Sequence, residues 1–273
     1  MFSISVLIKG FVVGATMMVP GVSGGSMAMI LGIYDQLISS VSSFFKDLKK
    51  NFMYLLQFGL AGIIGIVLCA RPIMGIIDRF PVVSMFFFIG LVFGSVPMLY
   101  KKAKIEKPSL KYMVSFLAGA IIVGAMAFLP QMNSAGVDGM SLSVFFLQIL
   151  TGIVVAIGFI LPGISTSYLL LLLGTYDFVM ASIASLDILA LVPFVLGFIL
   201  GVILLTRILE ICMQRYPSIT YTLILGFLIG SVYTVYPGTP QGMEILYSML
   251  SFALGFVLIY FVSVKEAELD EKN

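Results

Sequence analysis

Ten apolar stretches, most of them long enough to cross a bilayer, constrain what this chain can fold into. They lie at residues 1–19, 24–44, 53–77, 82–100, 111–129, 144–161, 165–186, 188–209, 218–236 and 245–263. A helix of about 20 apolar residues spans the hydrocarbon core of a membrane. Charged residues make up 10% of the 273 residues, too few to cover the surface of a soluble domain of this size. The sequence therefore predicts an all-α, polytopic membrane protein.

Residue types that build most catalytic and metal sites are scarce. The chain has no histidine, and its two cysteines, Cys69 and Cys212, lie in or at the end of apolar stretches, where buried thiols are favoured over a disulfide. Zinc sites, Ser-His-Asp triads and Cys-His dyads are excluded. The net charge of +2 and the lack of a nucleotide-binding G-x-x-x-x-G-K-[ST] motif argue against nucleic acid and against nucleotide hydrolysis. We predict no enzyme, no metal and no cofactor.

The two halves of the chain repeat each other. Val19-Pro20-Gly21-Val22-Ser23 recurs 142 positions later as Leu161-Pro162-Gly163-Ile164-Ser165, and Tyr34-Asp35 recurs at the same offset as Tyr176-Asp177. Further on, Arg79-Phe80-Pro81 matches Arg215-Tyr216-Pro217, and Arg71 matches Arg207, both 136 positions later. Such self-similarity indicates duplication. We predict a first repeat at 1–129, a second at 130–264 and a charged cytoplasmic tail at 265–273.

The distribution of lysine and arginine predicts how the repeats are oriented. Basic loops contain Lys46, Lys49 and Lys50, and then Lys101 to Lys111, whereas the loops at 130–143, 177–187 and 237–244 contain neither lysine nor arginine. Basic loops face the cytoplasm. If each Pro-Gly segment is a re-entrant hairpin that returns to its own side, the basic loops all face the cytoplasm. Only Arg71 and Arg79 then break the rule. Each repeat then has about three further transmembrane helices, and the second repeat is inverted.

The Pro-Gly pairs should break a helix at membrane depth. Proline removes a backbone donor and glycine permits unusual dihedrals, and such a break is tolerated only inside protein or beside a watery cavity. The half-helices that follow would present free N–H groups and hydroxyls to an anion. The alternative is a pair of kinked helices with serine caps. The candidate binding residues are Ser23, Gly24, Gly25, Ser26, Ser165, Thr166 and Ser167.

Four arginines and two Tyr-Asp pairs complete the candidate site. Arg71 and Arg207 lie toward the ends of long apolar stretches, where arginine either snorkels to the interface or pairs with an anion. Arg79 and Arg215 precede prolines and are interface anchors or ligand partners. We expect Tyr34-Asp35 and Tyr176-Asp177 at the ends of the half-helix segments, as coupling groups, caps or the first loop residues.

The two motifs resemble those of a bacterial membrane family, long catalogued as a domain of unknown function and now associated with polyprenyl-phosphate transport (PopT-type). The resemblance rests on Pro20 to Ser26 followed by Leu31 to Asp35, and on Leu161 to Ser165 followed by Leu173 to Asp177. It covers nearly the whole chain. It implies a flippase in the bacterial cytoplasmic membrane that recycles undecaprenyl phosphate, the carrier lipid of peptidoglycan synthesis. The implied partners are the lipid phosphate and membrane lipids, with a homo-oligomer left open.

Three other functions stay open on the sequence. A secondary transporter of a small anion would use the same half-helix site but enclose it from lipid. An ion channel is less favoured because no ring of charges is evident. A membrane-embedded enzyme is disfavoured by the missing catalytic groups.

Overall fold

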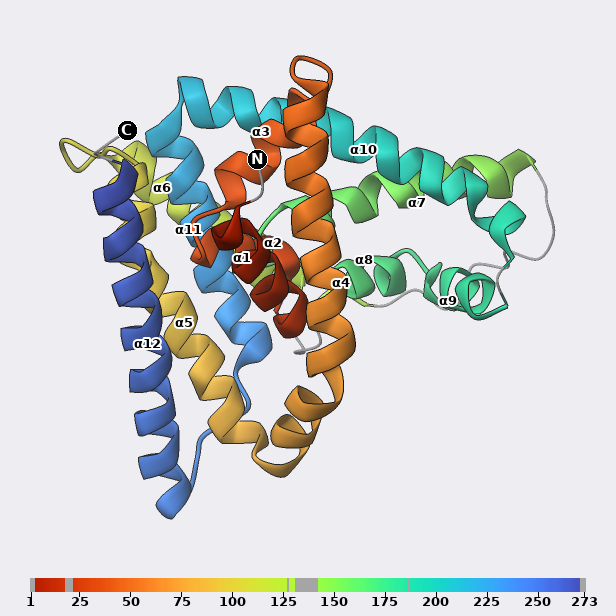
Figure 1. Cartoon of the computed structure of the whole chain (residues 1–273). Helices are drawn as coiled ribbons and strands as arrows, with labels where there is room; N and C mark the ends of the chain where they lie inside the picture. The colour runs from red at the N-terminus through yellow and green to blue at the C-terminus, as the bar shows by residue number, and fades with distance from the viewer. Residues whose placement is uncertain (1–2, 18–21, 127, 131–141, 186, 271–273) are drawn as a thin grey trace.

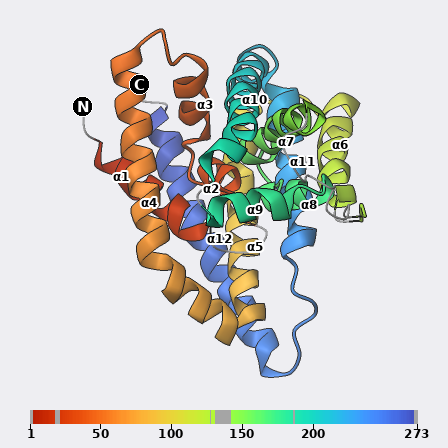
Figure 2. The same cartoon turned by 90° about the vertical axis from the view of Figure 1, so that its right-hand side faces the viewer.

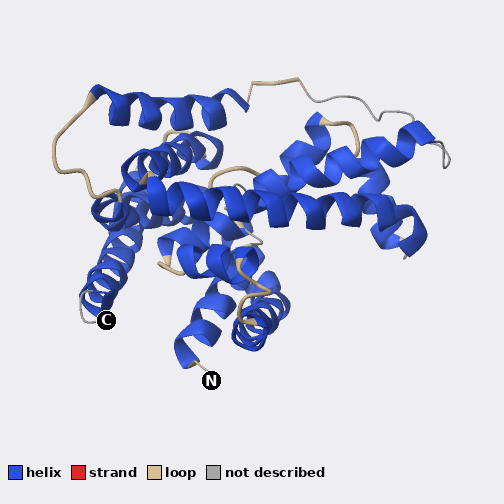
Figure 3. Cartoon of the chain, turned by 90° about the horizontal axis from the view of Figure 1, so that it is seen from above, coloured by secondary structure: helices blue, strands red, loops and turns tan. Residues whose placement is uncertain are grey.

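A computed structural model describes residues 3–17, 22–126, 128–130, 142–185 and 187–270. In these ranges every regular element is an α-helix (Figure 3), which confirms the predicted all-α class. The helices are α1 Ile4–Thr16, α2 Gly24–Ile30, α3 Tyr34–Ser42, α4 Leu48–Arg79, α5 Pro81–Lys102, α6 Leu110–Met126, α7 Leu142–Ile160, α8 Thr166–Leu172, α9 Tyr176–Ala184, α10 Ile188–Arg215, α11 Pro217–Val235 and α12 Met243–Asp270 (Figure 1).

Six helices of the described chain are long and apolar enough to cross a membrane: α4, α5, α7, α10, α11 and the Met243–Val262 part of α12. This confirms a multi-pass membrane protein. Helix α4 has 32 residues and is therefore about 48 Å long, which exceeds the roughly 30 Å hydrocarbon core. The 13 residues of α1 reach only about 20 Å and cannot span that core.

The helices pack as four antiparallel or crossing pairs that follow the sequence duplication. Helix α1 packs along α4, and α7 packs along α10 in the same way within the second half. The other two pairs join the halves, because α5 packs along α12 and α11 packs along α6 (Figures 1 and 2). The two halves therefore exchange helices and share one core.

Glycines permit the close approach of the helices that join the halves. A Cβ atom on Gly90 of α5 would lie 2.2 Å from the carbonyl oxygen of Phe252 on α12. The corresponding Gly226 of α11 would place a Cβ 2.1 Å from the carbonyl oxygen of Phe116 on α6. Small residues at such crossings let backbones touch, which is how membrane helices gain packing energy.

The turns that carry Lys46 and follow Arg215 lie at one end of the molecule, and the turn that follows Arg79 lies at the other. The turn between α3 and α4, the turn between α10 and α11 and the end of α12 all lie toward the top of Figure 1. The turn between α4 and α5 and the loop before α12 lie at the opposite end. The first of these turns carries Lys46, and Arg215 ends α10.

In each half, the short helix that follows the Pro-Gly motif ends after seven residues. Helix α2 ends at Ile30 and α8 ends at Leu172, and Gly32 (φ 73°) and Gly174 (φ 64°) follow them in the left-handed region. The chain then starts new helices at Tyr34 and Tyr176. The expectation that the Tyr-Asp pairs end half-helix segments is therefore wrong, because the left-handed glycines terminate the preceding helices first. The α8–α9 pair is bent by 118°.

Candidate functional site

The segment after the first Pro-Gly motif, called the first broken segment below, begins with the short helix α2, whose N-terminus is capped by Ser23. Pro20 and Gly21 lie outside the described residues, and the chain enters α2 directly after Ser23. The Ser23 Oγ accepts the Ser26 N–H at 3.1 Å, and the two serine hydroxyls lie 2.8 Å apart. A serine before the first helical residue satisfies a backbone donor that the helix itself leaves free.

This segment is docked onto the other half of the chain. The Ser26 Oγ accepts the backbone N–H of Gly163 at 2.7 Å, and the Tyr34 hydroxyl donates to the Ile160 carbonyl at 2.9 Å. A Cβ atom on Gly25 would lie 2.9 Å from that same Ile160 oxygen. The described neighbours of the two breaks therefore touch, and the first segment packs directly against the second Pro-Gly turn.

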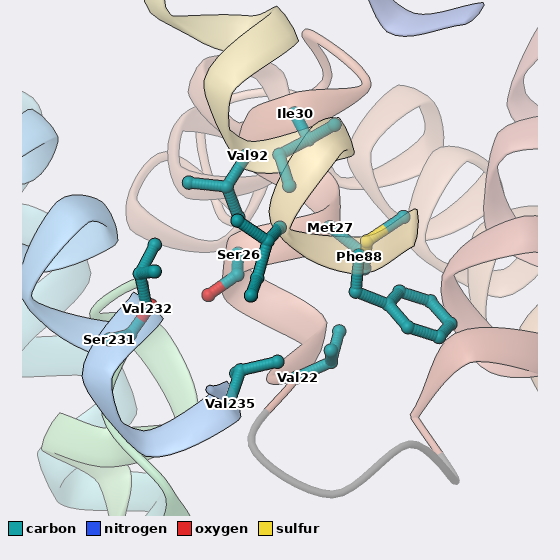
Figure 4. Close-up of a pocket in the computed structure, with 10 residues that line it drawn as sticks. Val22, Ser26, Met27, Ile30, Phe88, Val92, Ser231, Val232 and Val235 are labelled. Carbon is teal, nitrogen blue, oxygen red and sulfur yellow. The ribbon is translucent and has the colours of Figure 1, made fainter. Parts of the chain in front are cut away.

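A small cavity beside this contact shows how tightly the first segment is enclosed. It holds about 20 Å³ between α2, α5 and α11, and its polar members are Ser26 and Ser231 (Figure 4). The rest of its wall is apolar, including Val22, Val92 and Val235. This volume is enough for roughly one water molecule and is too small for a phosphate group.

The second Pro-Gly turn has a backbone shape that requires glycine. Gly163 has φ +84°, and a Cβ there would lie 2.5 Å from the Phe227 carbonyl oxygen on α11. The chain then begins α8, whose N-cap Ser165 accepts the Tyr168 N–H at 3.3 Å. The local chemistry is thus the same serine cap that opens α2.

The surroundings of the second segment are open. A cavity of about 340 Å³ is lined by Gly163, Ser165, Tyr168 and Thr234 together with the apolar Val123, Met126 and Ile164. Ser165 and Ser167 are exposed, and Thr166 is half-buried. The Tyr168 hydroxyl lies against the carbonyl oxygens of Met126 and Leu129, 2.9 Å from the latter. The cavity therefore combines hydroxyl groups with an apolar wall.

The two predicted coupling aspartates differ in their surroundings. The Asp35 Oδ2 lies 2.6 Å from the Lys102 Nζ and accepts the Tyr221 hydroxyl at 2.8 Å. Its Oδ1 is buried and has no hydrogen-bond partner within the described chain. Asp177 at the corresponding place is exposed. Asp35 therefore links α3 to α5 and to α11 of the other half.

The four predicted arginines are all exposed and do not line the cavity at Ser165. The Arg79 guanidinium carbon lies 5.5 Å from the centroid of the Phe80 ring, a contact typical of cation–π pairing. Arg207 lines a different cavity, between α3 and α10, together with Lys46 and Glu210. The structure therefore brings Ser165 and Arg207 to separate places.

Sequence reasoning missed several residues of these sites. Tyr168 and Thr234 line the open cavity, while Lys102 and Tyr221 hold Asp35. Tyr168 had a usable signal, because it stands where the repeat predicts the counterpart of Ser26. The Asp35 partners lie 67 and 186 positions away, and the repeat motifs do not point to either of them.

These observations define a multi-pass helical membrane protein in which the segment after the first Pro-Gly motif packs against the second Pro-Gly turn. The chain belongs to the VCA0040-like family, described as undecaprenyl phosphate translocase-like, which it matches over residues 13–249. It is 31% identical over 268 residues to a polyprenyl-phosphate transporter of Staphylococcus aureus, covering 92% of this chain and 93% of that protein. It is 29% identical over 252 residues to a polyprenyl-phosphate transporter of Vibrio cholerae serotype O1, covering 86% and 78%. No solved structure matches the chain.

Proposed function

We propose that this protein moves undecaprenyl phosphate across the bacterial cytoplasmic membrane and returns the carrier lipid to its inner leaflet. The observation that carries the proposal is the cavity of about 340 Å³ at the second broken segment, in a chain of the undecaprenyl phosphate translocase-like family. The names of its relatives as transporters support a role that is not enzymatic.

The cavity suits an amphipathic ligand. The Ser165 Oγ accepts a backbone N–H and keeps its own proton to donate to a phosphate oxygen. The Tyr168 hydroxyl, now held by carbonyl oxygens, can turn to a ligand that offers stronger acceptors, since hydrogen bonds to charged groups are stronger than those to neutral groups. Val123, Met126 and Ile164 offer apolar contacts to the first isoprenoid units.

The pairing of helices across the two halves suggests how the cavity opens to each side of the membrane in turn. The α1–α4 and α7–α10 pairs recur in the two halves, and the α5–α12 and α6–α11 pairs join them. We propose that residues 1–129 and 130–264 are inverted repeats, and that bundles made of helices from both repeats rock against each other, as in transporters built from inverted repeats. Labelling of single cysteines placed at Lys46 and at Gly238 from each side of a vesicle tests this topology. We expect opposite sides, and labelling from the same side contradicts the inversion.

The main test is transport in proteoliposomes. Purified protein is reconstituted with a fluorescent polyprenyl phosphate, and an impermeant quencher reports the fraction in the outer leaflet. We expect the protein to accelerate exchange between leaflets, and a polyprenyl alcohol without phosphate to stay slow. The alternative, transport of a small anion, predicts instead the uptake of labelled inorganic phosphate with no lipid exchange. That second result would falsify the lipid proposal.

A further inference from the structure

A second, charged cavity lies between α3 and α10, away from the cavity at Ser165. It holds about 350 Å³ and is open to the surface. Helix α3 and the turn after it come from the first half, and α10 comes from the second. Its polar and charged lining consists of Ser42, Ser43, Lys46, Arg207, Glu210 and Gln214.

The single carboxylate of this cavity is held by hydroxyl groups. The Ser39 Oγ donates to Glu210 Oε1 at 2.8 Å, and the Ser42 Oγ donates to Glu210 Oε2 at 2.6 Å. Glu210 is thereby fixed against α3. In the described part of the chain, neither Arg207 nor Lys46 forms an ion pair with a carboxylate. Two cations and one anion leave the cavity with a net positive charge.

The donor groups suit a phosphate. A guanidinium offers a planar fork that matches two phosphate oxygens, and an ammonium adds a second charge. The Gln214 amide and the Ser43 hydroxyl supply further neutral donors. Arg207 lies eight residues before the end of α10, and therefore about 12 Å below it, where an unpaired arginine is costly unless it reaches water or an anion.

The counterparts of Arg207 and α3 are placed differently. Arg71 is the counterpart of Arg207 and is exposed on α4. Helices α3 and α9 each pack against the long helix of their own half, α4 and α10, and α3 packs in addition against α10 across the halves. The charged cavity therefore lies where α3 of the first half meets α10 of the second.

We propose that the α3–α10 cavity is a phosphate-binding site, in which Arg207 and Lys46 hold the anion and Glu210 limits its affinity. The phosphate belongs either to a lipid headgroup at the basic end of the molecule or to free phosphate in solution. The lipid source rests on the proposed function, because the site would then receive the headgroup after translocation.

The test measures phosphate binding directly. The protein in lipid nanodiscs is titrated by calorimetry with inorganic phosphate and, separately, with farnesyl phosphate. We expect Arg207→Gln and Lys46→Gln each to weaken binding about tenfold, in line with the loss of a charge-assisted hydrogen bond. Arg207→Lys should weaken phosphate binding less, because lysine keeps the positive charge and lacks only the planar fork of the guanidinium. Lys49→Gln, which changes an exposed lysine in the first turn of α4, is the matched control and should bind normally.

The variant Glu210→Gln shows whether the charged residues of this cavity bind phosphate or only stabilise the fold. Removal of its negative charge should tighten phosphate binding severalfold, although it weakens the bonds from Ser39 and Ser42. Tighter binding of farnesyl phosphate than of inorganic phosphate assigns the site to the lipid headgroup, and equal binding assigns it to phosphate in general. Unchanged binding in both Arg207→Gln and Lys46→Gln, or weaker binding in Glu210→Gln, overturns the proposal. Lipid exchange by the wild-type protein is measured in parallel, so that failure of this site is distinguished from failure of the transport proposal.

Discussion

Ser26 in the first broken segment is 4% exposed and bonds to the second half of the chain, whereas Ser165 in the second segment is exposed and lines a cavity of about 340 Å³. Both segments begin with a serine that caps a seven-residue helix. The local chemistry is therefore shared, and the difference lies in the residues that follow.

The sequences after the two caps explain this difference. Gly24-Gly25-Ser26 is small enough to lie against the Ile160 carbonyl, whereas Thr166-Ser167-Tyr168 is too bulky for such an approach. The two segments share a sequence motif, but one serves the contact between the halves and the other is open to a ligand. We infer that the first segment supports the site and the second forms it.

The largest effect is expected where the first segment touches the second half. Gly25→Ala would place a Cβ 2.9 Å from the Ile160 oxygen, whereas Gly24→Ala would meet only the Met17 side chain at 3.5 Å. Overpacking against backbone costs about 1–3 kcal/mol, and we expect Gly25→Ala to lie near the upper end. Thermal unfolding in detergent should show a lower Tm for Gly25→Ala than for Gly24→Ala. Equal melting of the two variants would mean that the first segment is not closely docked.

Asp35 should contribute the next largest effect. Its side chain is 35% exposed and that of Lys102 is 20% exposed, so the pair lies between a surface and a buried ion pair. Asp35→Asn should therefore destabilise the fold by about 2 kcal/mol, partly because Lys102 loses its counter-charge. Asp177 is exposed, and Asp177→Asn should cost less, within about 1 kcal/mol, because interactions of exposed charges are weak. Comparable losses in both variants would remove the asymmetry between the segments.

Tyr34 and its counterpart Tyr176 should differ by a smaller amount in their contribution to stability. Tyr34→Phe removes the hydrogen bond to the buried Ile160 carbonyl and should cost about 1 kcal/mol. Tyr176 makes no hydrogen bond through its hydroxyl within the described chain, and Tyr176→Phe should be close to neutral. Chemical denaturation of both variants measures the difference. A neutral Tyr34→Phe would show that the bond contributes nothing to the contact between the halves.

How far the sequence predicts the molecule depends on the range of each interaction. Apolar length predicted the membrane class, and the Pro-Gly repeats predicted new short helices after Ser23 and Ser165, because these features are local. The serine caps belonged to the alternative, a pair of kinked helices. The pairing of α5 with α12 and the bond between Tyr221 and Asp35 join distant parts of the chain, which no local pattern specifies. The openness at Ser165 likewise depends on the side chains that surround it in space, among them Val123 and Thr234.

The smallest change, removal of one cap hydroxyl, gives the sharpest comparison of the two segments. Ser23→Ala and Ser165→Ala each delete a serine that accepts a backbone N–H, at 3.1 Å and 3.3 Å respectively. Loss of such a cap costs about 0.5–1 kcal/mol, so both variants should melt slightly and similarly below the wild type.

Transport should separate them. Only Ser165 lines the open cavity, and its hydroxyl is free to donate to a phosphate oxygen, so Ser165→Ala should slow lipid exchange by about three- to tenfold. Ser23→Ala should keep most of its transport, because the Ser23 hydroxyl faces Ser26 within a packed contact. The measurement is leaflet exchange in proteoliposomes, below the melting temperature of both variants and at equal protein content. If the two variants slow exchange equally, the two half-helices share the phosphate, and the division of roles between the segments is wrong.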